Sequence, residues 1–232
     1  YFRICFLDPF QGAVLANYAW EQGITSVYTL AELGNAYDLG LTSSFKTAFE
    51  KLGGTVIAEN FPTNQSDFTS YVTNAKKSGA QAIFAPTSIS YAQLIIEAAA
   101  TQNVGIPLYA GDTWDSNVIL DAAKGKNVEI NITTFYQEGG NKEFDEGFKK
   151  WLNSNANNLT NNGGNDIVSA VSAMGCDAYY VALEAAKLAK STKPADIMKA
   201  LWNVDYQGVT GEIKFDSTNG DADRKVAYIK AA

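Results

Sequence analysis

Five side chains in this sequence, each placed just after a short apolar segment, have the chemistry needed to hold a small polar molecule. They are Tyr37, Thr87, Ser88, Asp112 and Trp114. The carboxylate of Asp112 accepts charge-assisted hydrogen bonds from an ammonium group, worth about 1.5–3 kcal/mol net. Hydroxyl groups add donors and acceptors, and aromatic rings pack against the apolar part of a ligand. Together with the helix N-termini expected beside them, which favour anionic groups, these side chains suit a zwitterion.

Each of these residues also has a purely structural interpretation. Tyr37 fits a half-buried packing position, and Asp112 fits a turn or a helix cap before Thr-Trp-Asp-Ser. Thr87 and Ser88 stand where loop hydroxyls commonly cap helices. Trp114 fits a core or rim aromatic residue. The spacing alone leaves both interpretations open.

The sequence offers no constellation for catalysis or for a metal. It contains no histidine, which excludes Ser-His-Asp and Cys-His catalysis and histidine-based metal sites. No carboxylate pair stands out for acid–base work, and no glycine-rich segment has the phosphate-binding pattern. We therefore expect no catalytic residue, no metal and no cofactor, and a protein that is not an enzyme.

Charge and composition exclude further classes of protein. The net charge is −7 and only two arginines occur, Arg3 and Arg224, which argues against nucleic-acid or polyphosphate binding. The apolar fraction of 46% suits a packed core, and no apolar run is long enough for a membrane span. Tyr1–Phe6 has the pattern of a strand, not of a signal peptide, although a precursor segment could have been removed. Cys5 and Cys176 could pair or could be buried thiols.

The elements that must position these residues alternate along the first half of the chain. Apolar strands are expected at 2–7, 26–30, 55–61, 82–85, 107–110 and 128–135. Helical periodicity fills the intervals, at 11–22, at 38–52, after 66 and after 90. This pattern is typical of a doubly wound parallel sheet covered on both faces. Ligands of such sheets bind beyond the carboxyl ends of the strands, where the five side chains fall.

The second half of the chain has a different character. It carries predicted helices at 142–153, at 167–189 and from 194, an Asn- and Gly-rich loop at 153–165, and strands at 209–215 and 226–230 around a polar turn at 216–223. These strands are too few for a sheet of their own. We therefore expect that the partner of 209–215 is missing from this chain.

Several segments, in chain order, resemble one known family. They are Phe2-Arg3 with Asp8-x-x-Gln11-Gly12, Ala36-Tyr37-Asp38-Leu39-Gly40-Leu41, Ala110-Gly111-Asp112, Gly175-Cys176-Asp177-Ala178 and Gly208-Val209-Thr210-Gly211-x-x-x-Phe215-Asp216. Together they resemble the type I periplasmic binding proteins, in particular the branched-chain amino-acid (leucine, isoleucine, valine) group. The last segment is the most specific match, and the resemblance spans essentially the whole chain.

The resemblance implies roles for two residues and shows departures at others. It places Tyr37 against the bound ligand and pairs Asp112 with the α-ammonium of that ligand. Thr87 and Ser88 stand where the family usually carries a tyrosine pair, so the pocket is expected to be wider or more polar. Two further positions depart from the family pattern, with Asp38 in place of a glycine and Cys176 in place of a tyrosine.

The family architecture has two lobes joined by a hinge. The resemblance implies lobe 2 at 7–135 plus 218–232 and a partial lobe 1 at 1–6 plus 136–217, with hinge crossings near Phe6, Phe135 and Ser217. The chain resembles a family member without the N-terminal part of lobe 1, which normally supplies the groups that hold the ligand carboxylate. We therefore expect weak binding by this chain alone and a possible partnership with that missing segment.

The resemblance also implies a function. We expect an extracytoplasmic protein, in the bacterial periplasm or on the cell surface as a lipoprotein, that captures an amino acid by lobe closure and delivers it to an ABC permease. One alternative is a ligand-sensing module of a receptor or regulator. A second is an enzyme of the doubly wound class, against which the absence of histidine counts. A third is an amide- or sugar-binding relative, which Trp114 and Asp115 would suit.

Overall fold

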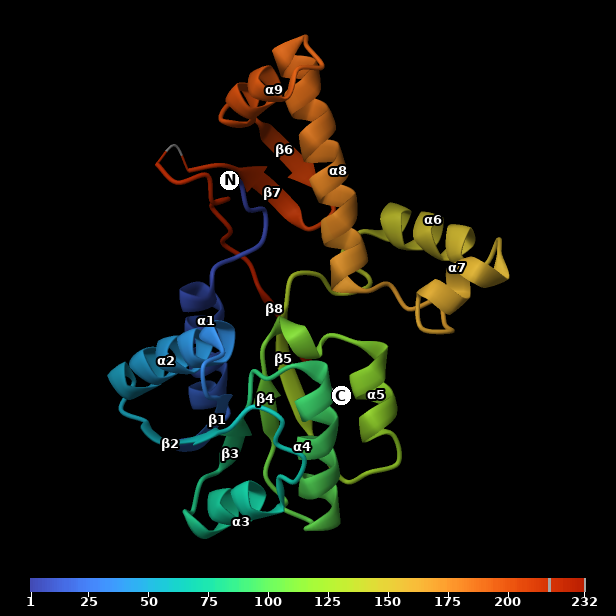
Figure 1. Cartoon of the computed structure of the whole chain (residues 1–232). Coiled ribbons are helices and arrows are strands. Elements are labelled where there is room, and N and C mark those ends of the chain that lie inside the picture. Colours follow the sequence, from blue (N-terminus) through green and yellow to red (C-terminus); the bar gives the residue numbers. More distant parts are fainter. Residues whose placement is uncertain (217, 232) are drawn as a thin grey trace. The chain divides into compact units, whose positions relative to one another are not determined.

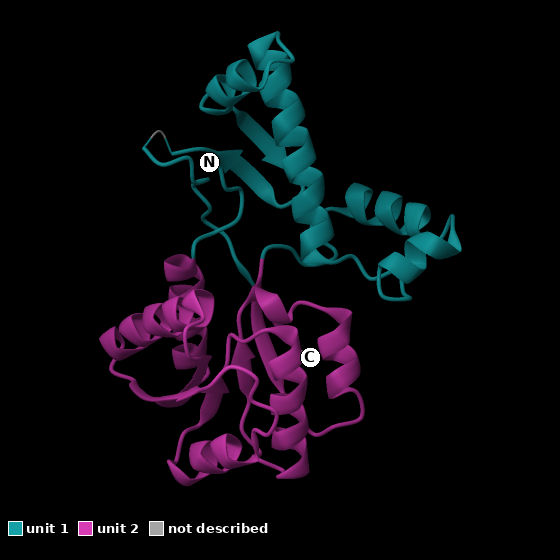
Figure 2. Cartoon of the chain, viewed as in Figure 1, with its two compact units in different colours: residues 1–7, 135–228 teal, residues 8–134, 229–232 magenta. Residues whose placement is uncertain are grey.

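The computed structural model describes residues 1–216 and 218–231 and divides them into two compact units (Figures 1 and 2). Unit 1 comprises Tyr1–Leu7 and Phe135–Tyr228, and unit 2 comprises Asp8–Thr134 and Ile229–Ala232. Among the described residues, no helix is long and apolar enough to cross a bilayer. The predicted side chains of the candidate site all belong to unit 2.

Unit 2 is built on a six-stranded sheet in the order β2-β1-β3-β4-β5-β8. Its strands are β1 (Ser26–Glu32), β2 (Thr55–Phe61), β3 (Ala82–Phe84), β4 (Leu108–Ala110), β5 (Ile130–Thr134) and β8 (Tyr228–Ala231). The pairings among β1 to β5 are all parallel. The chain leaves β1 toward β2 in one direction and reaches β3 on the other side, so the predicted doubly wound sheet is confirmed.

Helices cover both faces of this sheet. On one side lie α1 (Asp8–Glu21) and α2 (Ala36–Lys51), and on the other lie α3 (Thr69–Lys77), α4 (Ile89–Thr101) and α5 (Asn117–Ala123) (Figure 1). Successive strand residues point to opposite faces, so Phe84 packs with α1 and α2 while Ile83 packs under α4. Each fully buried side chain of this kind stabilises the fold by about 1.5–3 kcal/mol.

Three loops of unit 2 meet because the sheet is parallel. The loop from Glu32 leads into α2, the loop after Phe84 leads into α4, and the loop after Ala110 leads into the short 3₁₀ helix η1 (Asp112–Trp114). Asn35 fixes the first of these turns, since its side chain accepts hydrogen bonds from the N–H groups of Tyr37 and Asp38. The carboxyl edge of the sheet therefore collects residues that are far apart in the sequence.

Unit 1 contains four helices and a hairpin among its described residues. They are α6 (Lys142–Leu152), α7 (Ala156–Asn161), α8 (Ala170–Ala189), α9 (Pro194–Leu201), β6 (Asp205–Gly208) and β7 (Gly211–Lys214). The two strands pair in antiparallel fashion. An apolar cluster packs α8 and α9 against this hairpin through Val181, Ala200 and Ile213.

Asp177 on α8 holds the hairpin turn. Its buried carboxylate accepts hydrogen bonds from the N–H of Val209 at 2.7 Å, the N–H of Thr210 at 2.8 Å and the hydroxyl of Thr210 at 2.6 Å. A Cβ atom on Gly208 would lie 2.5 Å from this carboxylate, so the close approach requires glycine there. The segments Gly175–Ala178 and Gly208–Gly211, which the resemblance singled out, are therefore one packing unit.

Three expectations about elements were wrong. Segment 2–7 forms no regular strand and contributes only an isolated bridge between Arg3 and Asp221. The predicted strand 209–215 is one arm of the hairpin and pairs with Asp205–Gly208 inside this chain. The predicted loop 153–165 contains the short helix α7, whose start is capped by Asn155.

The predicted boundary after residue 217 also differs from the structure. Residues 218–228 belong to unit 1 and not to the sheet-bearing unit, while Ser217 itself lies outside the described residues. Asp221 forms an ion pair with Arg3 at 3.1 Å, and Ala222 bridges to Phe215. These contacts join residues 218–228 to the rest of unit 1, and the chain enters unit 2 at Ile229. No disulfide joins the cysteines that the structure describes.

We expect Asp177→Ala to lower the free energy of unfolding of unit 1 by about 3 kcal/mol or more, because it leaves three donors, two of them buried, without an acceptor. The matched control is Asp205→Ala, which removes an exposed ion pair with Lys214 and should cost less than about 1 kcal/mol. Both changes in stability are measured by denaturant unfolding that is monitored through hydrogen exchange of the α8 and hairpin amides. Equal effects of the two substitutions would contradict this role of Asp177.

Candidate functional site

The candidate site centres on Asp112, the first residue of η1, directly after β4. One of its carboxylate oxygens, Oδ1, accepts two hydrogen bonds, from the amide Nε2 of Gln11 at 2.5 Å and from the hydroxyl of Tyr37 at 2.8 Å. Gln11 lies in the first turn of α1 and Tyr37 lies in the first turn of α2. We call these three residues the Asp112 clamp. The structure thus brings the predicted residues Tyr37 and Asp112 into direct contact.

Tyr37 acts as a permanent donor in this clamp. Burial of its ring and the neighbouring carboxylate of Asp112 raise the pKa of Tyr37 well above its usual range. The phenol therefore keeps its proton at any physiological pH. The distance from its oxygen to Oε1 of Gln11 is 3.5 Å, longer than the 2.8 Å to Oδ1 of Asp112, so the hydroxyl donates its single hydrogen bond to the carboxylate.

Gly111 leaves the space that the side chains of Tyr37 and Gln11 need in order to reach Asp112. A Cβ atom at this position would lie 2.4 Å from the hydroxyl of Tyr37, 2.9 Å from Leu41 and 3.1 Å from Oε1 of Gln11. Its φ of −86° is ordinary for any residue, so the requirement for glycine comes from space and not from backbone strain. The sequence Ala110-Gly111-Asp112 therefore encodes a close approach between β4 and the two helices.

Thr87 and Ser88, at the end of β3, differ from each other. Thr87 is buried, and its carbonyl accepts hydrogen bonds from the hydroxyl of Thr113 at 3.2 Å and from the indole N–H of Trp114 at 3.0 Å. The hydroxyl of Thr87 is buried with no hydrogen-bond partner. Ser88 is exposed at the N-cap position of α4, but its side chain does not cap that helix and instead contacts Ser90.

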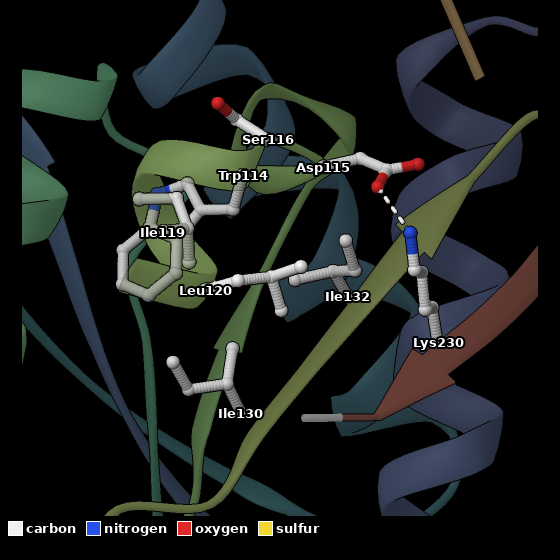
Figure 3. A pocket seen from close by; sticks show the side chains of 8 residues that line it. All are labelled: Trp114, Asp115, Ser116, Ile119, Leu120, Ile130, Ile132 and Lys230. Atoms are coloured by element: carbon white, nitrogen blue, oxygen red, sulfur yellow. Dashed lines mark hydrogen bonds and ion pairs between the residues drawn. The ribbon is translucent and has the colours of Figure 1, made fainter. Parts of the chain in front are cut away.

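Trp114 belongs to the core, in contrast to its prediction as a ligand contact. Its side chain is 1% exposed and packs in the cluster beneath α4 and α5. There it lines a pocket with Ile119, Ile130 and Ile132 (Figure 3). The short η1 helix turns the indole inward, so its N–H reaches the carbonyl of Thr87 and its ring faces apolar side chains. Trp114 therefore supports the loop that carries Asp112.

An ion pair closes one side of this pocket. The ammonium of Lys230 on β8 lies 2.7 Å from Oδ1 of Asp115 (Figure 3). The hydroxyl of Thr134 donates to Oδ2 of Asp115 at 2.5 Å. Both charges are thus satisfied within unit 2, and the remaining lining is apolar except for Ser116. This arrangement fastens β8 to the loop after η1 and offers no unpaired charge to a polar ligand. Asp115 therefore does not support the sugar-binding alternative.

Two residues near the site were not among the predicted contacts. Gln11 is 1% exposed and bonds directly to Asp112, and the sequence signal for it was its place in the Asp8-x-x-Gln11-Gly12 segment. Asp38 is also 1% exposed, and its Oδ2 accepts from the N–H of Glu32 at 3.0 Å while its Oδ1 has no partner. Burial raises the pKa of Asp38 to about 6. Among the described residues, no cluster of carboxylates and thiols could hold a metal ion.

The sequence and the fold of this chain are similar to those of known proteins. A family model described as "Periplasmic binding protein" matches residues 2–232. A search of the curated proteins found no match. Among solved structures, a leucine-binding protein from Thermotoga maritima superposes with a TM-score of 0.84 and 26% identity, over 98% of this chain and 63% of that one.

Two other solved structures show the same fold at lower identity. A branched-chain amino-acid substrate-binding protein from Streptococcus pneumoniae, solved with isoleucine, has a TM-score of 0.77 and 23% identity over 97% of this chain and 62% of its own. A solute-binding protein from R. palustris, solved with benzoate, has a TM-score of 0.80 and 18% identity over 98% and 61%. The chain thus spans somewhat less than two thirds of the length of these structures.

We expect Gly111→Ala to break the hydrogen bond between Tyr37 and Asp112, because the new methyl carbon would lie 2.4 Å from the phenol oxygen and force the ring to move. The loss of packing and of this bond should lower the free energy of unfolding of unit 2 by about 1–3 kcal/mol. Gly40→Ala is the matched control, since nothing lies within 4 Å of its added methyl group. Denaturant unfolding and the NMR signals of the Tyr37 ring measure the change. An undisturbed ring in Gly111→Ala would refute it.

The raised pKa of Asp38 predicts a pH dependence of stability. The folded chain holds this proton up to about pH 6, whereas the unfolded chain releases it near the ordinary pKa of 3.8. The contribution of Asp38 to the free energy of unfolding is therefore greatest below about pH 4 and is lost as the pH rises to about 6. Relative to wild type, Asp38→Asn should become progressively more stable over that interval. Urea unfolding across this pH range tests the prediction, and Asp121→Asn, which changes an exposed carboxylate, is the control. If the free energies of unfolding of wild type and Asp38→Asn change in parallel with pH, the prediction is contradicted.

Proposed function

Because the chain belongs to the periplasmic binding protein family, we propose that it captures a small polar solute, an amino acid, at the carboxyl edge of the unit 2 sheet. The observation that carries this proposal is the carboxylate of Asp112. It is partly exposed, and both of its intramolecular hydrogen bonds go to the same oxygen, Oδ1. A ligand ammonium would bind Oδ2.

The neighbouring groups support an amino acid over a simple anion. Asp112 carries no cationic partner in the clamp, so its negative charge remains for the ligand. That charge repels a ligand that bears only a carboxylate, such as an aromatic acid, and attracts one that also bears an ammonium. Ser88 offers an exposed hydroxyl at the start of α4, where uncapped N–H groups favour the ligand carboxylate.

The family assignment supports further parts of the proposal. We propose that the protein acts outside the cytoplasm and delivers its ligand to the membrane subunits of an ABC permease. Two of the similar solved structures support this: one is a branched-chain amino-acid transporter substrate-binding protein with isoleucine, and the other is the solute-binding protein of an ABC transporter with benzoate. A sensory role would use the same binding residues, and a fused signalling domain or the gene context would distinguish it. No step in this function requires the chain to change its ligand chemically.

An exposed apolar face on α8 supports the predicted partner segment. Val171, Tyr179 and Leu183 recur at helical spacing and are 67%, 66% and 37% exposed. Large apolar side chains grouped in this way commonly mark an interface. We propose that polypeptide outside this chain packs on this face, and that its presence strengthens ligand binding.

The proposal is tested by measuring the binding of a panel of amino acids to the 232-residue chain, by NMR titration and by thermal shift. We expect at least one free amino acid to bind and to raise the melting temperature, and Asp112→Asn to weaken that binding at least tenfold, since it removes the charge that pairs with the ammonium. Asp121→Asn removes an exposed carboxylate on α5 and should leave binding unchanged.

Other outcomes would redirect the assignment. Binding of an amide or sugar, without any amino acid, would keep the family and overturn both the substrate class and the role of Asp112. If benzoate binds tightly and Asp112→Asn does not weaken that binding, the substrate class would be aromatic acids, and the proposed role of Asp112 would be wrong. Chemical conversion of a bound compound on long incubation would overturn the proposal of a binding protein.

A further inference from the structure

Gln11 is the one member of the Asp112 clamp that is almost fully buried. Its side chain is 1% exposed, and its amide nitrogen lies 2.5 Å from Oδ1 of Asp112. A carboxylate accepts hydrogen bonds only, so the amide must turn its NH₂ group toward Asp112. A glutamine buried at this distance from a carboxylate has little freedom to move.

The position of Gln11 is fixed by the packing of α1 on α2. The next residue, Gly12, approaches α2 so closely that a Cβ atom there would lie 2.8 Å from the backbone nitrogen of Phe45. The two helices therefore touch at the turn that carries Gln11. Because Tyr37 is in the first turn of α2, both donors of the clamp are held by the same helix pair.

The chemistry of these donors determines what remains available on Asp112. Both are neutral, so they orient the carboxylate without cancelling its charge, as an arginine or lysine would. Both bind Oδ1, which prevents the carboxylate from rotating freely. A single oriented acceptor, Oδ2, suits an ammonium group, whereas a guanidinium pairs best with both oxygens at once.

We propose that Gln11 is a positioning residue of this site. It holds Asp112 so that Oδ2 faces the ligand. As a result, the site prefers a ligand with an ammonium group over one of the same shape that lacks it. This inference rests on the proposed function, and it adds that the preference depends on a buried residue that does not touch the ligand. A purely structural role would instead make Gln11 matter equally for every ligand.

The test compares two probes of matched shape, L-leucine and 4-methylpentanoate, which lacks the amino group. Their affinities are measured by NMR titration at millimolar ligand on wild type, on Gln11→Met and on Gln22→Met. Methionine has the length of glutamine but no donor. Gln22 is an exposed glutamine just after the end of α1 and is the matched control.

We expect wild type and Gln22→Met to prefer L-leucine, and Gln11→Met to reduce that preference at least tenfold. Tyr37→Phe removes the other donor and should reduce the preference in the same direction, which keeps the test decisive if Gln11→Met folds poorly. An unchanged preference in both clamp variants, or an equal loss of affinity for both probes, would overturn the inference and leave the proposed function standing. A wild type without any preference would overturn both.

Discussion

The parallel pairing of β1, β3, β4 and β5 is the constraint on which the candidate site depends. In a parallel sheet every strand ends at the same edge, so loops from residues near 35, 87 and 112 meet although long stretches of chain separate them. The reversal of strand order between β1 and β3 sends α1 and α2 to one face and α3, α4 and α5 to the other. The first turns of α1 and α2 then approach the end of β4, where Asp112 stands.

Two hydrogen-bonded carboxylates of this chain, those of Asp177 and Asp112, follow different patterns. Asp177 is buried, and three donors of the hairpin turn engage both of its oxygens, so it stabilises the hairpin. Asp112 is partly exposed, and its two donors share one oxygen. The same residue type thus fills a structural position in unit 1 and a candidate binding position in unit 2. What separates the two is how many acceptor positions the protein itself occupies, and a ligand can use only what remains.

The side chains around Asp112 also divide by where their backbone points them. Ser88 faces solvent, Thr87 is buried with an unpaired hydroxyl, and Trp114 is turned into the core by the 3₁₀ turn that follows Asp112. All three follow strands in the sequence, so their positions alone made them look equivalent. An unpaired buried hydroxyl such as that of Thr87 costs about 1–3 kcal/mol.

The sequence by itself determined the alternation of strands and helices in unit 2, the doubly wound class, and the placement of Tyr37 and Asp112 at one sheet edge. Hydrophobic periodicity is a local property, and strands that alternate with helices are typical of a parallel sheet. Only the tertiary structure decided that Gln11 joins Asp112, that Trp114 is core, that β7 pairs with β6, and that residues 218–228 belong to unit 1. These features depend on which side chains meet across the fold. Such contacts arise from packing between distant elements, which the hydrophobic periodicity of a single element does not reveal.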